Sequence, residues 1–105
     1  MRSEDKTAVL LIRESPGRAP DPSRMRELFG LAQAAGYRVL AEISQRRSRD
    51  HLFQIGRGKI EEAISYHPHR LIFYNPLSPG QVYNIRSQFG VTVLDRFNLI
   101  LEIFS

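Results

Sequence analysis

Residues 45–62 of this 105-residue chain concentrate the side chains that could bind an anion. Two glycines, which allow close backbone approach and positive φ, stand where a helix begins, and the free N–H groups of a helix start attract negative charge. The candidate residues are the cations Arg46, Arg47, Arg49, Arg57 and Lys59 and the turn residues Gly56 and Gly58. The segment therefore predicts a site for phosphates, either those of a nucleic acid or those of a small ligand.

The glycine turn does not match the known phosphate-binding motifs. A P-loop needs a glycine at position 53 and a hydroxyl residue at position 60, where this chain has phenylalanine and isoleucine. A dinucleotide fingerprint needs a third glycine at position 61, where this chain has glutamate. Two interpretations stay open: a weak nucleotide-binding turn formed by Gly56, Gly58 and Lys59, or a turn that only shapes the loop and caps the helix.

Arg46, Arg47 and Arg49 also have two interpretations. Each could neutralise a phosphate of RNA or DNA, which would make binding depend on salt. They could instead form a solvated loop, since Asp50 follows them and only a few charges are involved. Phe53 could stack on a base, but the apolar residues near it are more typical of a core position.

No acid–base pair or set of metal ligands stands out in the sequence. His67 and His69 flank a proline without a carboxylate or cysteine nearby, which is typical of a surface turn. Asp95 is better placed to cap a final helix than to act in catalysis, and no serine has the context of a nucleophile. The sequence therefore predicts no catalytic residue and no metal site.

The composition indicates one domain with a bias toward polyanions. Fifteen Lys and Arg against eleven Asp and Glu give a net charge of +4 and a pI near 10, and arginine, whose planar fork suits phosphate, supplies most of the cations. Cysteine is absent, which excludes disulfides and fits the cytoplasm. The apolar run at residues 8–12 is too short for a signal sequence or a membrane span.

Apolar runs alternate with amphipathic segments along the chain. The runs predict strands, and the stripes at helical spacing predict helices between them. Asp21 and Ser78, each followed by proline, are typical helix N-caps, and Gly36 and Gly90 are typical helix ends. The predicted strands are residues 7–13, 37–44, 70–74 and 91–94, and the predicted helices are residues 21–36, 59 to about 66, 78–90, and a last one from 95 or 98.

This alternation predicts an α/β fold: a four-stranded parallel sheet of order 2-1-3-4 with helices on both faces, a Rossmann-like three-layer sandwich. The first and third strands are the most apolar and belong in the centre, whereas Arg38 and Glu42 interrupt the second, which suits an edge. One domain spans residues 7–105, and residues 1–6 are expected to be flexible.

Such a sheet gathers the candidate site at one edge. Loops that follow parallel strands meet at the carboxyl edge of the sheet, where these folds bind ligands. His67 and His69 fall at the opposite edge. The loops at the carboxyl edge are residues 13–21, 45–59, 75–78 and 95–96.

Five short motifs carry a family resemblance. They are Gln45-Arg46-Arg47, Ile55-Gly56-x-Gly58-Lys59-Ile60-Glu61-Glu62, Leu77-Ser78-Pro79-x-Gln81 with Asn84, Val93-Leu94-Asp95-Arg96 and Leu99-Ile100-Leu101-x-Ile103-Phe104. In this order and spacing they resemble the N-terminal domain of the HflX family of ribosome-associated GTPases. The resemblance runs from about Thr7 to the last residue, with Gln54 standing where the family commonly has tyrosine.

The resemblance implies a longer parent protein. A helical hairpin and a C-terminal GTPase domain would follow Ser105, with GTP and Mg²⁺ bound in that missing domain, so that this fragment needs no cofactor and hydrolyses no GTP. It also implies a second nucleotide site, for ATP, whose matching positions are Gly56, Gly58 and Lys59. The implied partner is the large ribosomal subunit with its ribosomal RNA, in the cytoplasm.

Two hypotheses follow from the sequence. The first is an N-terminal RNA-binding or ribosome-binding domain of an HflX-like GTP-binding protein that acts on the large ribosomal subunit. The second is a stand-alone α/β domain that binds ATP or another phosphorylated ligand with weak or no hydrolysis.

Overall fold

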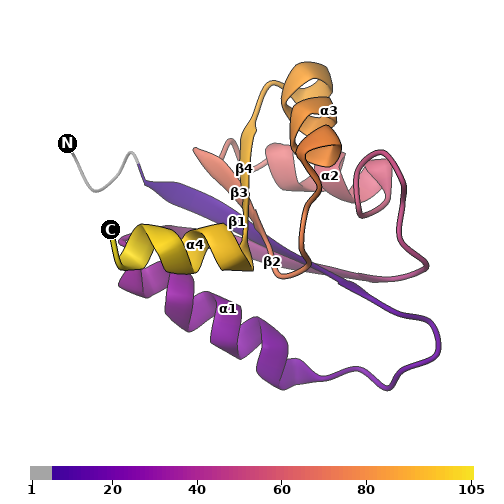
Figure 1. The fold of residues 1–105 in the computed structure, drawn as a ribbon, viewed down its shortest axis with the longest axis horizontal. Helices are drawn as coiled ribbons and strands as arrows, with labels where there is room; N and C mark the ends of the chain where they lie inside the picture. Colours follow the sequence, from indigo (N-terminus) through magenta and orange to yellow (C-terminus); the bar gives the residue numbers. More distant parts are fainter. Residues whose placement is uncertain (1–5) are drawn as a thin grey trace.

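In the computed structural model, which describes residues 6–105, the chain forms a four-stranded parallel sheet with helices on both faces (Figure 1). Strands and helices alternate without exception. Their bounds are β1 Thr7–Glu14, α1 Pro22–Ala34, β2 Arg38–Arg46, α2 Arg57–Ile64, β3 Arg70–Phe73, α3 Pro79–Phe89, β4 Thr92–Asp95 and α4 Arg96–Ile103. The prediction of a flexible start lies outside the described residues except at Lys6, whose Nζ donates to the carbonyl oxygen of Ala35 at 2.6 Å.

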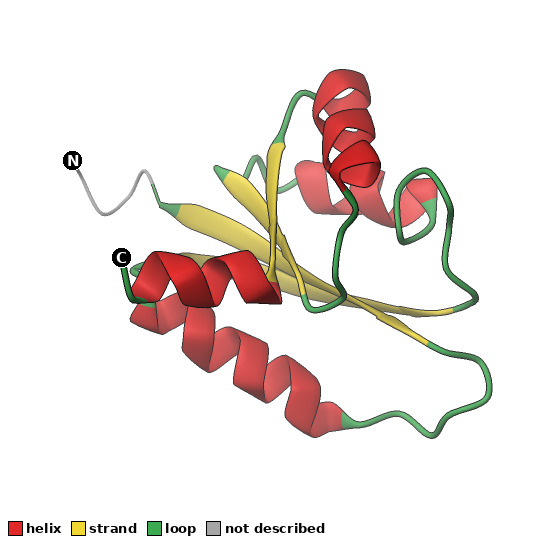
Figure 2. Ribbon diagram, viewed as in Figure 1, coloured by secondary structure: helices red, strands yellow, loops and turns green. Residues whose placement is uncertain are grey.

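The strand order is β2-β1-β3-β4, so the predicted fold class and order are confirmed. All three strand pairs are parallel, and α1 and α4 pack on one face while α2 and α3 pack on the other (Figure 2). The register of β1 and β2 shifts between Ala8 and Val9, whose partners are Val39 and Ala41. Leu40 is therefore an extra residue, a β-bulge on the edge strand.

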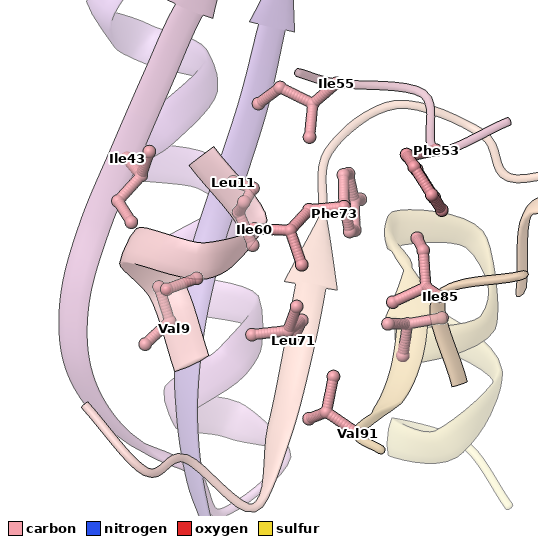
Figure 3. Packing of buried hydrophobic residues seen from close by; sticks show 12 residues of the cluster. Val9, Leu11, Ile43, Phe53, Ile55, Ile60, Leu71, Phe73, Ile85 and Val91 are labelled. Atoms are coloured by element: carbon pink, nitrogen blue, oxygen red, sulfur yellow. The ribbon is translucent and has the colours of Figure 1, made fainter. Parts of the chain in front are cut away.

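The strand β1 contributes to two hydrophobic cores, one on each face of the sheet. Its residues alternate between the faces: Val9 and Leu11 pack with α2 and α3, and Ala8, Leu10 and Ile12 pack with α1 and α4. Figure 3 shows the first of these cores, in which residues of all four strands meet those of α2 and α3. A strand covered on both faces needs a continuous apolar sequence, which is the pattern of residues 8–12.

The predicted helix caps are present. Asp21 accepts from the N–H of Ser23 at 3.0 Å, Ser78 forms a capping box with Gln81, and Asp95 accepts from the N–H of Asn98 at 2.9 Å. These side chains occupy donors that a helix start leaves unpaired. Gly36 and Gly90 have φ values of 90° and 68°, a conformation that glycine adopts at helix ends without strain.

Two boundaries differ from the prediction in the segment that carries the candidate site. β2 continues to Arg46 because its pairing with β1 continues as far as Glu14. α2 begins at Arg57 rather than at residue 59, because Gly56 already acts as its N-cap. Arg46 is therefore a strand residue, and Arg57, Gly58 and Lys59 belong to a helix.

Within residues 6–105 no helix is both long and apolar enough to cross a membrane.

Candidate functional site

The carboxyl ends of the four strands lie along one edge of the sheet, which we call the carboxyl edge (Figure 1). The side chain of Asn75, two residues after the end of β3, ties this edge to β1. Its Oδ1 accepts from the backbone N–H of Arg13 at 2.7 Å, and its Nδ2 donates to the carbonyl oxygen of Arg13 at 2.9 Å. Asn75 thus extends the β1–β3 pairing beyond the end of β3 and holds the backbone of Arg13 in place.

Gln54 links the loop after β2 to the two central strands. Its Oε1 accepts from Arg13 Nε at 2.7 Å, and its Nε2 donates to the carbonyl oxygen of Pro76 at 2.6 Å. The residue is buried and has a φ of 70°, which is uncommon for a side chain other than glycine. Because both ends of the amide are paired, the surrounding contacts hold this backbone conformation.

The loop after β2 is fixed by hydrogen bonds and is not a freely solvated loop. Asp50 Oδ1 accepts from the N–H groups of Leu52 and Phe53 at 2.9 and 2.8 Å, and the backbones of Asp50 and Gln54 exchange two hydrogen bonds. Gln81 on α3 donates to the carbonyl oxygens of Asp50 and His51. Phe53 is buried in the α2–α3 core (Figure 3), so the core interpretation of this aromatic is confirmed.

Three arginines, Arg13, Arg47 and Arg49, form what we call the arginine cluster. Burial, followed by the positive charges of Arg49 and Arg47, lowers the pKa of the Arg13 guanidinium from its ordinary value. The guanidinium stays charged at any physiological pH, because arginine starts from a very high pKa. The contributions of Arg49 and Arg47 to this shift mean that positive charges lie near Arg13 at the carboxyl edge, a condition that attracts an anion.

Two of the predicted phosphate-binding arginines are committed to the protein itself. Arg46 Nη2 donates to the carbonyl oxygens of Arg18 and Pro16 at 2.6 and 3.2 Å, so it holds the loop between β1 and α1. Arg47 Nε donates to the carbonyl oxygen of Ser48 at 2.9 Å, and its Nη2 lies 3.5 Å from Asp50 Oδ2. Their charges remain at the edge, but some of their donors already bind the protein itself.

Arg49 is the cation of the cluster that remains available. It is exposed and makes no hydrogen bond or ion pair with any residue that the structure describes. The Asp50 carboxylate beside it is engaged by Arg47 and by the turn. Arg49 therefore presents its full guanidinium to solvent.

The glycines of the segment act differently from the prediction, because neither has a positive φ. Gly56 has a φ of −63°, and its N–H donates to Gln45 Oε1 at 2.8 Å. A Cβ on Gly56 would lie 2.8 Å from that same oxygen, so the missing side chain admits Gln45 rather than a ligand. Gly58 lies inside α2 and has open space where a Cβ would be. The positive φ of this loop is found at Gln54 instead.

Arg57 and Lys59 do not join the arginine cluster. Arg57 lies over the rings of Phe53 and Phe89, at 5.9 and 5.1 Å from their centroids, and it pairs with Glu61 at 3.5 Å. Lys59 Nζ lies 3.4 Å from Glu62 Oε1. Both cations therefore point along or across α2 toward carboxylates and aromatic rings.

The residues at the start of α2 do not fit a phosphate cradle. Gln45 occupies the N–H of Gly56, the neighbouring carboxylates offset the charges of Arg57 and Lys59, and only the N–H groups of Arg57 and Gly58 lack an acceptor within residues 6–105. The nucleotide site at Gly56, Gly58 and Lys59 stays a prediction that this geometry does not favour.

The remaining candidates have structural roles. Asp95 is buried, caps α4 and accepts from the N–H of Leu77 at 3.0 Å. His67 and His69 lie at the other edge of the sheet, where the N–H of His69 donates to Thr7. Within the described part of the chain, no group of three or more His, Asp and Glu side chains is arranged to hold a metal ion.

Sequence reasoning missed three residues that organise this edge: Arg13, Gln54 and Asn75. Arg13 ends an apolar strand, where a lone cation is expected to face solvent. Gln54 has no sequence signal for a positive φ. Asn75 gave a partial signal, since Asn-Pro after a strand predicts a turn, but the pairing of its amide with β1 depends on strand order.

Comparison with known proteins relates the chain to GTP-binding proteins. The profile of the family described as "GTP-binding GTPase N-terminal" matches residues 22–105. The chain is 38% identical to the GTPase HflX of Thermofilum pendens over 110 aligned positions, which cover 100% of the chain and 26% of that protein. It is 36% identical to the GTPase HflX of Thermococcus kodakarensis over 101 positions, which cover 92% of the chain and 22% of that protein.

A solved structure shares the fold. It is a GTP-binding protein from the archaeon Sulfolobus solfataricus in complex with GDP, and it superposes with a TM-score of 0.74 at 29% identity, over 94% of this chain and 30% of that chain. The present chain thus spans about a quarter of the length of these relatives.

Proposed function

The chain belongs to the family of GTP-binding GTPase N-terminal domains, as an HflX-like N-terminal domain, and from this premise we propose that it binds ribosomal RNA of the large subunit through its carboxyl edge. The observation that carries the proposal is the arginine cluster. Arg13 and Arg47 are positively charged and fixed by contacts within the protein, while Arg49 is exposed and has no partner among the described residues.

Phosphate binding explains this arrangement of charge. A guanidinium on a rigid loop loses little conformational freedom when it binds phosphate, and each phosphate that it neutralises releases counterions. The loop is rigid because Asp50, Gln54 and Gln81 fix its backbone. Arg49 is then the residue that contacts the RNA backbone, and Arg13, Arg46 and Arg47 contribute charge and position.

In this proposal the chain itself neither binds nor hydrolyses GTP. The relatives are GTPases about four times as long as this chain, and we assign GTP, Mg²⁺ and hydrolysis to a further domain of such a longer protein. The chain itself acts as a binding module, and its place of action is the cytoplasm, where ribosomes work.

Removing one arginine tests the proposal. Binding of the purified chain to isolated large ribosomal subunits is measured by cosedimentation at several salt concentrations, for the wild type and for Arg49→Ala. Loss of one phosphate contact lowers the slope of log affinity against log salt by about 0.7–0.9. Arg49→Ala is preferred to a triple substitution, because Arg46 and Arg47 also support the fold.

Arg86→Ala is the matched control. Arg86 is also exposed, but it lies in the last turn of α3, away from the carboxyl edge. It should leave both affinity and salt slope at the wild-type values. An Arg49→Ala variant with an unchanged slope, or equal losses in the two variants, would refute the role of this edge.

A further inference from the structure

A groove runs between α1 and the edge strand β2, on the face of the sheet that α1 covers. It has a volume of about 610 Å³. A second hollow of about 290 Å³ shares Pro22, Met25 and Glu42 with it and continues toward the carboxyl edge. We name the larger cavity the α1–β2 groove. Its lining residues are Pro22, Met25, Arg26, Phe29, Gly30 and Glu42. Such a volume accommodates a few side chains.

The outer edge of β2 borders this groove and is unpaired. β2 is the longest strand of the sheet, and β1 pairs with one side of it. Within residues 6–105 no segment pairs with the other side. A free edge offers a row of N–H and C=O groups to an added strand. An extended segment placed there would direct every second side chain over the groove, because side chains alternate between the faces of a sheet.

Gly30 keeps the groove open. It lies inside α1 and is exposed, and a Cβ built on it meets nothing within 4 Å. Glycine inside a helix costs stability relative to alanine, and no contact among the described residues requires a glycine at this position. The missing side chain therefore creates space on the wall of the groove that faces β2.

Charge indicates what kind of side chain the groove accepts. Glu42 is exposed and makes no hydrogen bond or ion pair with any described residue, although apolar Met25 and Phe29 lie on the opposite wall. Glu14 and Asp21 line the continuation of the groove. Since Arg26 is the only cation among the lining residues, a basic side chain finds an available carboxylate in Glu42.

A second copy of this chain fits the groove poorly. Beyond the bulge, the side chains of β2 on the groove side are Glu42, Ser44 and Arg46, as their alternation and their contacts with α1 and the β1–α1 loop indicate. Val39, the apolar residue of β2 on this face, is already packed against the core between the sheet and α1. The β2 strand of another copy would therefore bring mainly polar side chains toward Met25 and Phe29, which favours an occupant with a different sequence.

We propose that the α1–β2 groove binds an extended segment of a partner protein, which adds to the outer edge of β2 and alternates apolar with basic side chains on the groove side. The apolar side chains contact Met25 and Phe29, and the basic one pairs with Glu42. Backbone pairing supplies affinity and the groove supplies specificity, as in other cases of strand addition. This surface is separate from the arginine cluster and does not depend on RNA binding.

A synthetic peptide tests the proposal directly. The probe has nine residues, the length of β2, with leucine and lysine alternating on one face and threonine on the other. Fluorescence anisotropy of the labelled peptide should show saturable binding to the 105-residue chain. Hydrogen exchange should slow in residues 38–46 but not in residues 92–95, the other edge strand. The control is the same peptide with alternate amides N-methylated, which cannot pair with a strand and should bind far more weakly.

Two variants connect binding to the groove. Glu42→Lys should lower affinity for the lysine peptide by about tenfold and raise it for a peptide with glutamate in place of lysine. Gly30→Leu should fill the groove and weaken binding of both peptides while Tm stays at or above the wild-type value, because leucine is a better helix former than glycine.

Several results would overturn the proposal. These are no saturable binding at millimolar peptide, binding that N-methylation leaves unchanged, or wild-type affinity in Gly30→Leu. Sedimentation that shows a dimer, with residues 38–46 protected from exchange before peptide is added, would assign the edge to a second copy instead.

Discussion

Arginines lie at both the amino edge and the carboxyl edge of the sheet, but they differ in the partners that their guanidinium groups have. At the amino edge, where the strands begin, Arg70 Nη1 donates to Glu102 at 2.8 Å and to the hydroxyl of Tyr37 at 3.0 Å. Tyr37 in turn donates to Glu102 at 2.9 Å. At the carboxyl edge, Arg13 donates to Gln54 Oε1 and to the carbonyl oxygen of Arg47, and Arg47 pairs with Asp50. Arg49, by contrast, has no acceptor among the described residues.

The difference separates a structural cation from an available one. The Arg70–Glu102–Tyr37 triad joins the start of β3, the turn before β2 and the end of α4. Its charges are paired with each other, although Arg70 Nε is buried without a partner among the described residues. In the arginine cluster, burial and then the neighbouring positive charges lower the pKa of Arg13, and charges of one sign near one another cost stability and attract anions. Residue type alone does not distinguish the two roles, whereas the partners do.

The largest expected effect comes from breaking the amino-edge triad. Arg70→Ala leaves the half-buried Glu102 carboxylate without its cation and should lower the free energy of unfolding by about 2 kcal/mol, which corresponds to a fall in Tm of roughly 10 °C. Chemical denaturation and calorimetry measure both quantities. Binding to large ribosomal subunits should stay unchanged in the folded variant.

Arg49→Ala is the counterpart at the carboxyl edge. An exposed side chain without partners should change the free energy of unfolding by no more than about 0.5 kcal/mol. If Arg49→Ala destabilised the chain as much as Arg70→Ala does, the distinction between the two edges would be wrong.

A substitution at Gln54 should affect stability and binding together. Gln54→Ala removes the acceptor of Arg13 Nε and the donor to Pro76. The free energy of unfolding should fall by about 1.5 kcal/mol, and the arginines of the cluster should move apart. Affinity for ribosomal subunits should fall as well. Gln54→Gly loses the same bonds but adopts the φ of 70° without strain, so it should be more stable than Gln54→Ala by about 1 kcal/mol. Equal stability of the two variants would mean that this φ carries no strain.

The fold could be predicted from the sequence because its signals are local. Continuous apolar runs, the N-caps Asp21 and Ser78, and the terminating glycines Gly36 and Gly90 each act within a few residues. Strand order followed from which runs were apolar on both faces, and the polar interruptions Arg38 and Glu42 placed β2 at the edge. These signals do not depend on distant contacts.

The site could be predicted only in part because its geometry depends on distant pairs. The sequence placed the loop after β2 at the correct edge, but Gln45, eleven residues from Gly56 in the chain, occupies the N–H that was assigned to an anion. Arg57 finds its contact with the ring of Phe89 only after α2 and α3 have packed. Which arginine remains available is thus decided by tertiary contacts, and composition cannot reveal it.

The stability of the amino edge should also depend on pH, through Tyr37. Burial, together with the hydrogen bond that Tyr37 donates to Glu102, raises the pKa of Tyr37 to about 12. An unfolded tyrosine titrates near pH 10, so between these values the unfolded chain loses the proton first. The contribution of the hydroxyl to stability is therefore complete below pH 10 and is lost as the pH rises through about 12.

Tyr37→Phe isolates this contribution from the general effect of alkali. The variant should be less stable than the wild type by about 1 kcal/mol at neutral pH, because one hydrogen-bonded hydroxyl is removed. Denaturation at a series of pH values should show that this difference is constant up to pH 10 and then shrinks, because the wild type alone must keep a proton on Tyr37. Ultraviolet absorption of tyrosinate gives a second reading, in which one tyrosine of the four titrates late in the wild type and is missing in the variant. A difference in stability that stays constant up to pH 12 would show that the Tyr37 hydroxyl is not coupled to Glu102, and the amino edge would then rest on the Arg70–Glu102 pair alone.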